Sequence, residues 1–98
     1  MSDDEPGFAL PAFKPEDALQ ALRRALRDLK LAERGNAFEL RGKRVLEAAA
    51  EAGALQVRLA RKLALTPEWD RISVHNANEH RKLIDEVKKR LARWAQED

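Results

Sequence analysis

The chain has 98 residues, of which 19 are Lys or Arg and 17 are Asp or Glu, so its formal net charge is +2. This length suits one domain, and the absence of cysteine excludes disulfides, thiolate metal sites and a cysteine nucleophile. Every apolar run is shorter than the roughly 18 residues that span a bilayer, and acids stand where a signal peptide carries positive charge. We therefore expect a cytoplasmic protein with no membrane contact.

Residues 1–13 are predicted to form an acidic and apolar arm ahead of a single compact domain at 14–98. Pro6 and Pro11 interrupt any periodic pattern there, whereas Phe8, Leu10 and Phe13 are apolar enough to dock. Residues 1–17 carry five acids and one lysine, while residues 18–98 carry 18 basic and 12 acidic residues. A basic body of this kind favours anionic partners, and the acidic arm would compete with them for the same basic surface.

A first helix is predicted over residues 14–35. Pro15 suits the first helical position, and the acids at 16 and 17 complement the positive end of the helix dipole. Gly35 and Asn36 are typical of a helix end. One apolar stripe recurs at spacings of three and four residues, formed by Leu19, Leu22, Leu26 and Leu29.

A second helix is predicted over residues 76–98. Asn76 and Glu79 have the spacing of a capping box, in which each side chain satisfies a backbone N–H of the other. The apolar face of this helix consists of Ile84, Val87, Leu91 and Trp94. Just before it, residues 72–74 read as a brief edge strand.

The middle of the chain, residues 45–65, has two interpretations. In the first, LEAAAEAGALQVRLARKLAL resembles the helix-turn-helix of bacterial DNA-binding proteins, with Gly53 in the turn. The resemblance covers about twenty residues and implies an all-α fold. Residues that would then face the DNA groove are Gln56, Arg58, Arg61 and Lys62. Glu51, however, falls where that motif buries an apolar residue.

In the second interpretation, the same residues form a β-hairpin closed at residues 51–54. Opposed residue numbers then sum to 105, so that Leu46 faces Leu59 and Ala48 faces Val57. Because side chains alternate along a strand, these apolar residues share one face. Glu47 meets Arg58 on the other face as an attractive pair, and a slip of one residue would destroy the apolar face. The poor strand propensity of LEAAAEA argues against this reading.

The hairpin accounts for more residues than the helix pair, so it is the favoured fold. A two-stranded hairpin is marginal alone. We therefore expect a small α+β domain, in which a long antiparallel hairpin is packed by two helices in the order α-β-β-α. Gly42 would lie in mid-strand, at a bulge or sharp twist. The second face of the hairpin would stay polar and open, or pair across a homodimer.

The register of 105 also places Arg44 opposite Arg61 and Lys43 opposite Lys62. Like charges in such positions repel unless they fan into water or surround an anion. This pattern predicts an anion-binding or nucleic-acid-binding patch, which the phosphate backbone would contact. Its members are Arg41, Lys43, Arg44, Arg58, Arg61 and Lys62.

No motif for catalysis or cofactor binding is present, so we expect neither an enzyme, nor a cofactor, nor a small-molecule ligand. His75 and His80 are five residues apart, which is not the i, i+4 spacing of a helical metal pair, and no metal site is predicted. Trp69, predicted on a loop and flanked by acids, is the candidate contact residue for a protein partner. The first hypothesis for function is thus a non-catalytic interaction module that binds a protein or itself, and the alternative is a nucleic-acid-binding protein.

Overall fold

The first helix of the computed structural model, which describes residues 13–96, begins where the sequence predicts. Helix α1 (Pro15–Asp28) starts at its proline, and Glu16 and Asp17 lie in its first turn. Leu22 and Leu26 are completely buried, as the apolar stripe requires. The predicted arm lies outside the described residues except for Phe13, which packs against the core.

Helix α1 ends well before Gly35, at a turn around Lys30. The Lys30 backbone has φ of 72°, and its N–H donates to the carbonyl of Arg27 at 2.9 Å. The Leu31 N–H donates to the carbonyl of Leu26 at 3.1 Å, which completes a Schellman motif. Leu26 and Leu31 both join the core, and this apolar contact offsets the cost of a left-handed lysine.

Residues 32–60 form four antiparallel strands joined by two-residue turns. They are β1 (Ala32–Arg34), β2 (Ala37–Leu40), β3 (Lys43–Glu51) and β4 (Ala54–Ala60). Gly42 is not in mid-strand as predicted, because it forms the β2–β3 turn with Arg41. Both residues have positive φ, of 54° and 78°, which matches the right-handed twist of the flanking strands.

The predicted hairpin is confirmed as β3 and β4, in the register that sums to 105. Leu46 faces Leu59, Glu47 faces Arg58 and Ala48 faces Val57. The helix-turn-helix reading of residues 45–65 is therefore wrong. Alternation buries the apolar side chains of both strands on one face, and this tertiary burial overrides the helix propensity of the alanines.

The predicted edge strand at 72–74 is the second half of β5 (Trp69–Val74), which pairs with β4. Helix α2 (Ala77–Ala95) follows, and the Asn76 side chain accepts a hydrogen bond from the Glu79 N–H at 2.8 Å. The Glu79 carboxylate accepts from the His75 N–H at 2.7 Å. The two residues thus cap the helix reciprocally, although the second bond goes one residue earlier than in a standard capping box.

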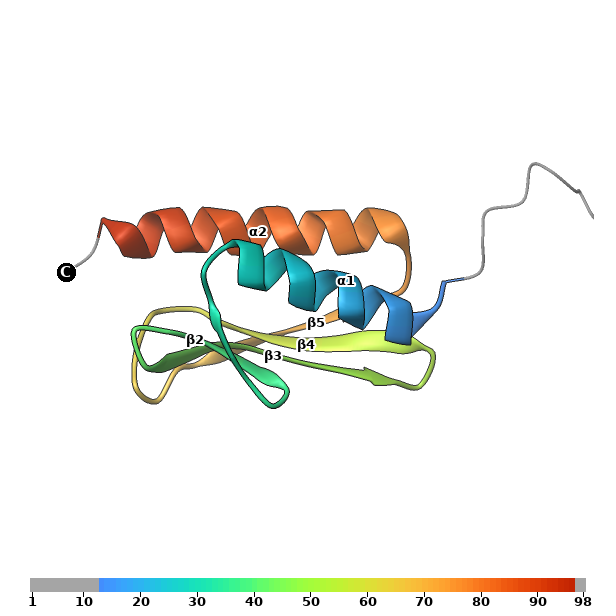
Figure 1. Ribbon diagram of the computed structural model, residues 1–98, viewed down its shortest axis with the longest axis horizontal. Coiled ribbons are helices and arrows are strands. Elements are labelled where there is room, and N and C mark those ends of the chain that lie inside the picture. The colour runs from blue at the N-terminus through green and yellow to red at the C-terminus, as the bar shows by residue number, and fades with distance from the viewer. Residues whose placement is uncertain (1–12, 97–98) are drawn as a thin grey trace, which may run out of the picture.

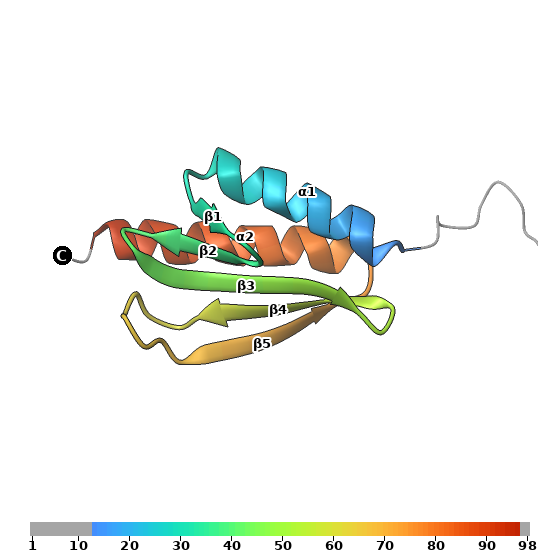
Figure 2. The same ribbon diagram turned by 60° about the horizontal axis from the view of Figure 1, so that its bottom comes forward.

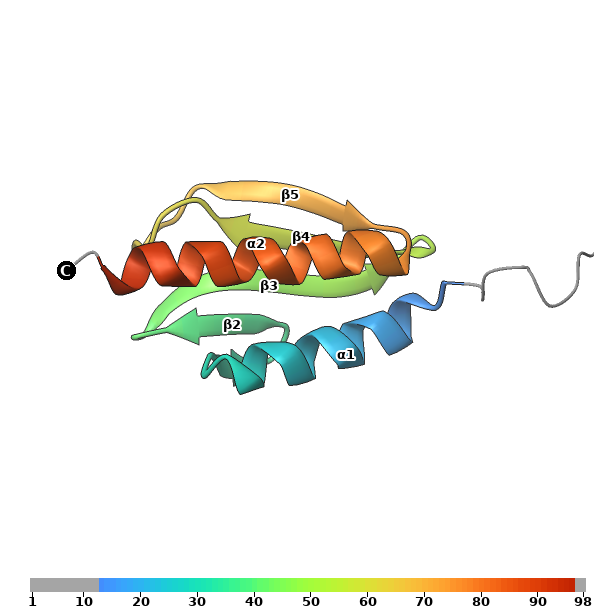
Figure 3. The same ribbon diagram turned by 90° about the horizontal axis from the view of Figure 1, so that it is seen from above.

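The five strands form one sheet in chain order, and both helices lie on the same side of it (Figure 1). Seen from above, α1 and α2 run next to each other across the sheet (Figure 3). The molecule is thus a small α+β domain with a hairpin packed by two helices, as predicted, widened by three further strands. The largest fully buried side chains between the layers are Trp94, Phe38, Leu22, Leu26, Leu46, Leu55 and Leu59.

Candidate interaction surface

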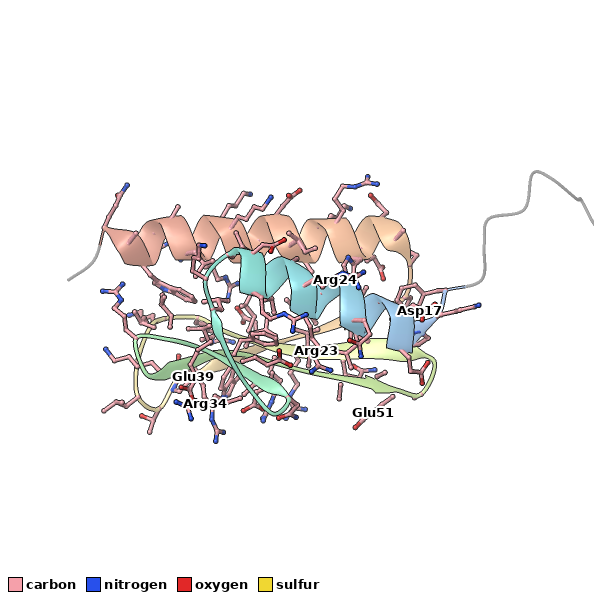
Figure 4. All side chains as sticks on the ribbon, in the orientation of Figure 1. Asp17, Arg23, Arg24, Arg34, Glu39 and Glu51 are labelled. Carbon is pink, nitrogen blue, oxygen red and sulfur yellow. The ribbon has the colours of Figure 1, made fainter. Side chains whose placement is uncertain are left out.

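One face of the sheet carries no helix, and Figure 2 brings this face forward. Its side chains alternate with the buried ones, so they point away from the helices, as Glu51 does in Figure 4. We call this surface the open face. Its polar and partly exposed residues are Arg34, Glu39, Arg44, Glu47, Ala49, Glu51, Gln56, Arg58, Trp69, Arg71 and Ser73.

Glu47 is the centre of charge pairing on the open face. It forms an ion pair with Arg58, its directly opposed partner on β4, and a second with Arg44 at 3.2 Å. The Glu47 side chain is only 13% exposed, whereas the Arg58 side chain is 46% exposed. Two arginines therefore cover one nearly buried carboxylate while keeping part of their own surface in solvent.

Trp69 lies next to this cluster, at the start of β5. The guanidinium carbon of Arg58 is 5.4 Å from the centroid of the Trp69 ring, within the range of a cation–π contact. The Trp69 side chain is half-buried and packs against the core. Trp69 was predicted in a loop, but its strand position makes it part of a rigid surface with Arg58.

A shallow hollow of about 350 Å³ opens on the same face. Ala49 contributes a small side chain between longer neighbours, so the hollow reaches close to the backbone there. Gln56 and Ser73 border this region and are joined by a 2.6 Å hydrogen bond, donated by the serine hydroxyl. The lining residues are Asn36, Glu47, Ala48, Ala49, Glu51, Gln56, Val57, Arg58 and Arg71. The hollow therefore has a mixed polar and apolar lining.

The predicted stacking of like charges between β3 and β4 does not form. The pairing of these strands ends at Leu46 and Leu59, and a β-bulge leaves Val45 without a partner on β2. The bulge lets Val45 and Leu46 both enter the core, and it places Arg44 opposite Glu39 instead of Arg61. Strict alternation along β3 stops at the bulge, so the register of 105 does not extend beyond Leu46 and Leu59.

The six residues of the predicted basic patch are consequently divided between places. Arg44 and Arg58 lie on the open face with Glu47. Arg41 instead donates to the carbonyl of Trp94, near the end of α2, at 3.2 Å. The remaining three members lie elsewhere. Arg61 pairs with Asp70, Lys43 is half-buried and Lys62 is exposed.

Asp70 forms ion pairs with two arginines on the helix side of the sheet. Its carboxylate accepts from Arg61 at 2.7 Å and pairs with Arg90 of α2 at 2.9 Å. Hydrogen bonds from Arg61 and Arg90 hold the pKa of the Asp70 carboxyl below its ordinary value. Arg90 also donates to the carbonyl of Ala60 at 2.9 Å, so it ties α2 to the end of β4.

The role of Arg90 was missed from the sequence, although one signal for it existed. It falls on the apolar side of the α2 helical repeat, where a charged residue needs a buried partner. Its side chain is 14% exposed and pairs with both Glu86 and Asp70. This arrangement makes it a structural contact between layers.

The histidines are structural within the described chain. His80 contacts the carbonyl of Ala18 at 3.1 Å, which joins α2 to α1, and His75 lies beside Glu79 at 3.3 Å. Hydrogen bonding by His75, first through its backbone N–H, lowers the pKa of the Glu79 carboxyl. Residues 13–96 contain no cluster of three or more metal-binding side chains, and neither of their helices is long and apolar enough to cross a membrane.

Comparison of the chain with family models, with curated protein sequences and with solved structures found no match. The geometry of the surface is therefore the only basis for a proposed function.

Proposed function

We propose that this protein is a cytoplasmic, non-catalytic interaction module that binds a protein surface through its open face. The observation that carries the proposal is the one-sided packing of the sheet: both helices cover one face, and the other presents Trp69 under Arg58 beside the hollow at Ala49. Tryptophan and arginine are the residue types enriched at the energetic centres of protein interfaces.

The occupant that we propose for the open face is a second copy of the chain. The face carries four arginines and three glutamates, a net charge of only +1, so two copies related by a two-fold axis can meet with little net repulsion. The glutamates lie on β2 and β3, whereas Arg58 and Arg71 face each other on β4 and β5, so the arginines of one copy can meet the glutamates of the other. The charged residues of the open face are Arg34, Arg44, Arg58, Arg71, Glu39, Glu47 and Glu51.

The expected affinity is modest because the surface is small. The part of the face on β3, β4 and β5 measures roughly 24 Å by 14 Å from strand rise and spacing. A stable interface buries about 800 Å² on each partner, which this area does not reach. We therefore expect a reversible dimer whose population follows protein concentration.

Sedimentation equilibrium over a wide concentration range tests this proposal. The variant Arg71→Glu with Ser73→Glu adds negative charge to the exposed side chains of β5 without touching the core. The matched control, Arg24→Glu with Gln20→Glu, makes the same change in charge on exposed positions of α1. We expect the wild type and the control to dimerise alike and the β5 variant to remain monomeric. Equal behaviour of all three proteins would contradict the open face as the interface.

The nucleic-acid alternative receives less support at the predicted patch, because Glu47 offsets Arg44 and Arg58, and Asp70 with Glu68 offsets Arg61. A phosphate backbone would have to displace these carboxylates before it could use the arginines.

A further inference from the structure

The outer side of α2 carries a second surface, which differs from the open face in its charge. Seven positions of this helix face away from the sheet within one arc of the helical repeat and are all exposed. They are Arg81, Lys82, Asp85, Lys88, Lys89, Ala92 and Arg93. Five of them are basic and one is acidic, and we call this set the basic face of α2. Figure 4 shows several long side chains tipped with nitrogen on this side of the helix.

The basic residues of this face differ from the arginines of the sheet in their pairing. On the sheet, Arg34, Arg44 and Arg58 each pair with a glutamate. The basic face of α2 forms no ion pair with any other side chain of residues 13–96. Asp85 lies within one helical turn of four of the basic residues, so it reduces the local potential without cancelling it. An excess of positive charge therefore remains in solvent.

The composition of this face restricts the kinds of partner that it can bind. It has no exposed large apolar side chain, because Leu83, Val87 and Trp94 are buried against the sheet. An amphipathic helix that enters a membrane surface needs its apolar side available, so a lipid partner does not fit. A hydrophobic protein interface does not fit either. Lysine and arginine on a straight, rigid helix suit a partner with regularly spaced negative charges.

We propose that the basic face of α2 binds the phosphate backbone of nucleic acid without reading its sequence. From Arg81 to Arg93 the helix rises about 18 Å. Each strand of duplex DNA presents one negative charge about every 3.4 Å along its axis, so this length lies over about five phosphates. The binding is independent of the proposed dimer, since the two surfaces lie on opposite sides of the molecule.

Fluorescence anisotropy with a labelled duplex DNA and with a labelled single-stranded RNA tests the proposal. The variant Lys82→Gln, Lys88→Gln, Lys89→Gln removes three charges from the basic face. The matched control Arg44→Gln, Lys62→Gln, Arg71→Gln removes three charges from exposed positions elsewhere. Each lost phosphate contact lowers the slope of log affinity against log salt by about 0.9 on a duplex and 0.7 on a single strand. We expect the α2 variant to lose about 2 to 3 from the slope and the control to lose less than 1.

Three outcomes would overturn the proposal: no binding of either probe at low salt, equal loss in both variants, or equally tight binding of polyglutamate. The last would assign the face to acidic proteins. Binding of one probe alone would support the proposal and identify the nucleic acid. If the α2 variant does not fold, backbone amide shifts of the wild-type chain give a second readout. Addition of the duplex should then shift residues 81–93, and shifts confined to β3–β5 would contradict the assignment.

Discussion

Glu47 and Arg58 face each other across β3 and β4, and their side chains form an ion pair on the uncovered side of the sheet. This single relationship fixes the parity of both strands. With Glu47 and Arg58 outward, Leu46 and Leu59 must point inward, where each is at most 1% exposed. The pair therefore connects the register of the hairpin to the composition of the open face.

A double-mutant cycle measures the contribution of this pair. Glu47→Gln and Arg58→Gln should each lower the free energy of unfolding, and their coupling should be about 0.5 to 1 kcal/mol, as for other cross-strand charge pairs. The coupling should decrease in high salt, because the Arg58 side chain is partly in solvent. Chemical denaturation at two salt concentrations gives both values. A coupling of zero at low salt would contradict the pairing.

Phe38 tests the placement of β2, which the sequence did not predict as a separate strand. Its side chain is 1% exposed between the sheet and the helices. Phe38→Ala should lower the free energy of unfolding by about 3 to 5 kcal/mol through lost burial and the cavity that remains. Leu65→Ala is the control, since Leu65 is 81% exposed and its truncation should cost less than about 0.5 kcal/mol. Similar losses for both variants would place Phe38 outside the core.

The turn between β3 and β4 contains a residue whose substitution should stabilise the protein. Ala52 adopts φ of 53° beside Gly53, a conformation in which asparagine is favoured over alanine. Ala52→Asn should raise the free energy of unfolding by about 0.5 to 1 kcal/mol, seen as a higher melting temperature. Ala52→Val should lower it, because a β-branched side chain fits poorly at positive φ. If valine stabilises the protein more than asparagine does, the turn has another geometry.

Acid should weaken the connection between α2 and the sheet through Asp70. Arg61 and Arg90 lower the pKa of this carboxyl in the folded chain. Its stabilising effect is therefore present above the unfolded value of about 3.9 and is lost as pH falls through the lower folded value. The melting temperature of Asp70→Asn should lie below that of the wild type at pH 7, and the gap should close below about pH 4. A gap that stays constant down to pH 3 would contradict this role.

The fold was predictable wherever a pattern alternated without interruption. The prediction failed where the backbone departs from regular geometry. Residues 46–59 alternate cleanly, so the hairpin register followed from the sequence. The end of α1 did not follow from the sequence, because Lys30 occupies the left-handed position and lysine rarely signals a helix end. The turn at Arg41 was not predicted either, because arginine also rarely adopts positive φ. Strands β1 and β2 were therefore not recognised as separate strands.

The surface was less predictable than the fold. The bulge at Val45 reverses the alternation of β3, and it separates Arg44 from Arg61. Acids distant along the chain, such as Asp70 for Arg61, then neutralise charges that looked exposed in sequence. The positive surface that remains outward is on α2, where the helical repeat alone determines which side faces solvent.

The most direct test of the proposed function is the concentration dependence of the backbone amide shifts of the wild-type protein. On dilution, we predict that shifts change on the open face, at Glu47, Gln56, Arg58 and Arg71 and at the indole N–H of Trp69. Residues 81–93 of α2 should remain unchanged in the same spectra. Shifts that do not change at any residue, or that change on the helices instead, would contradict self-association through the open face.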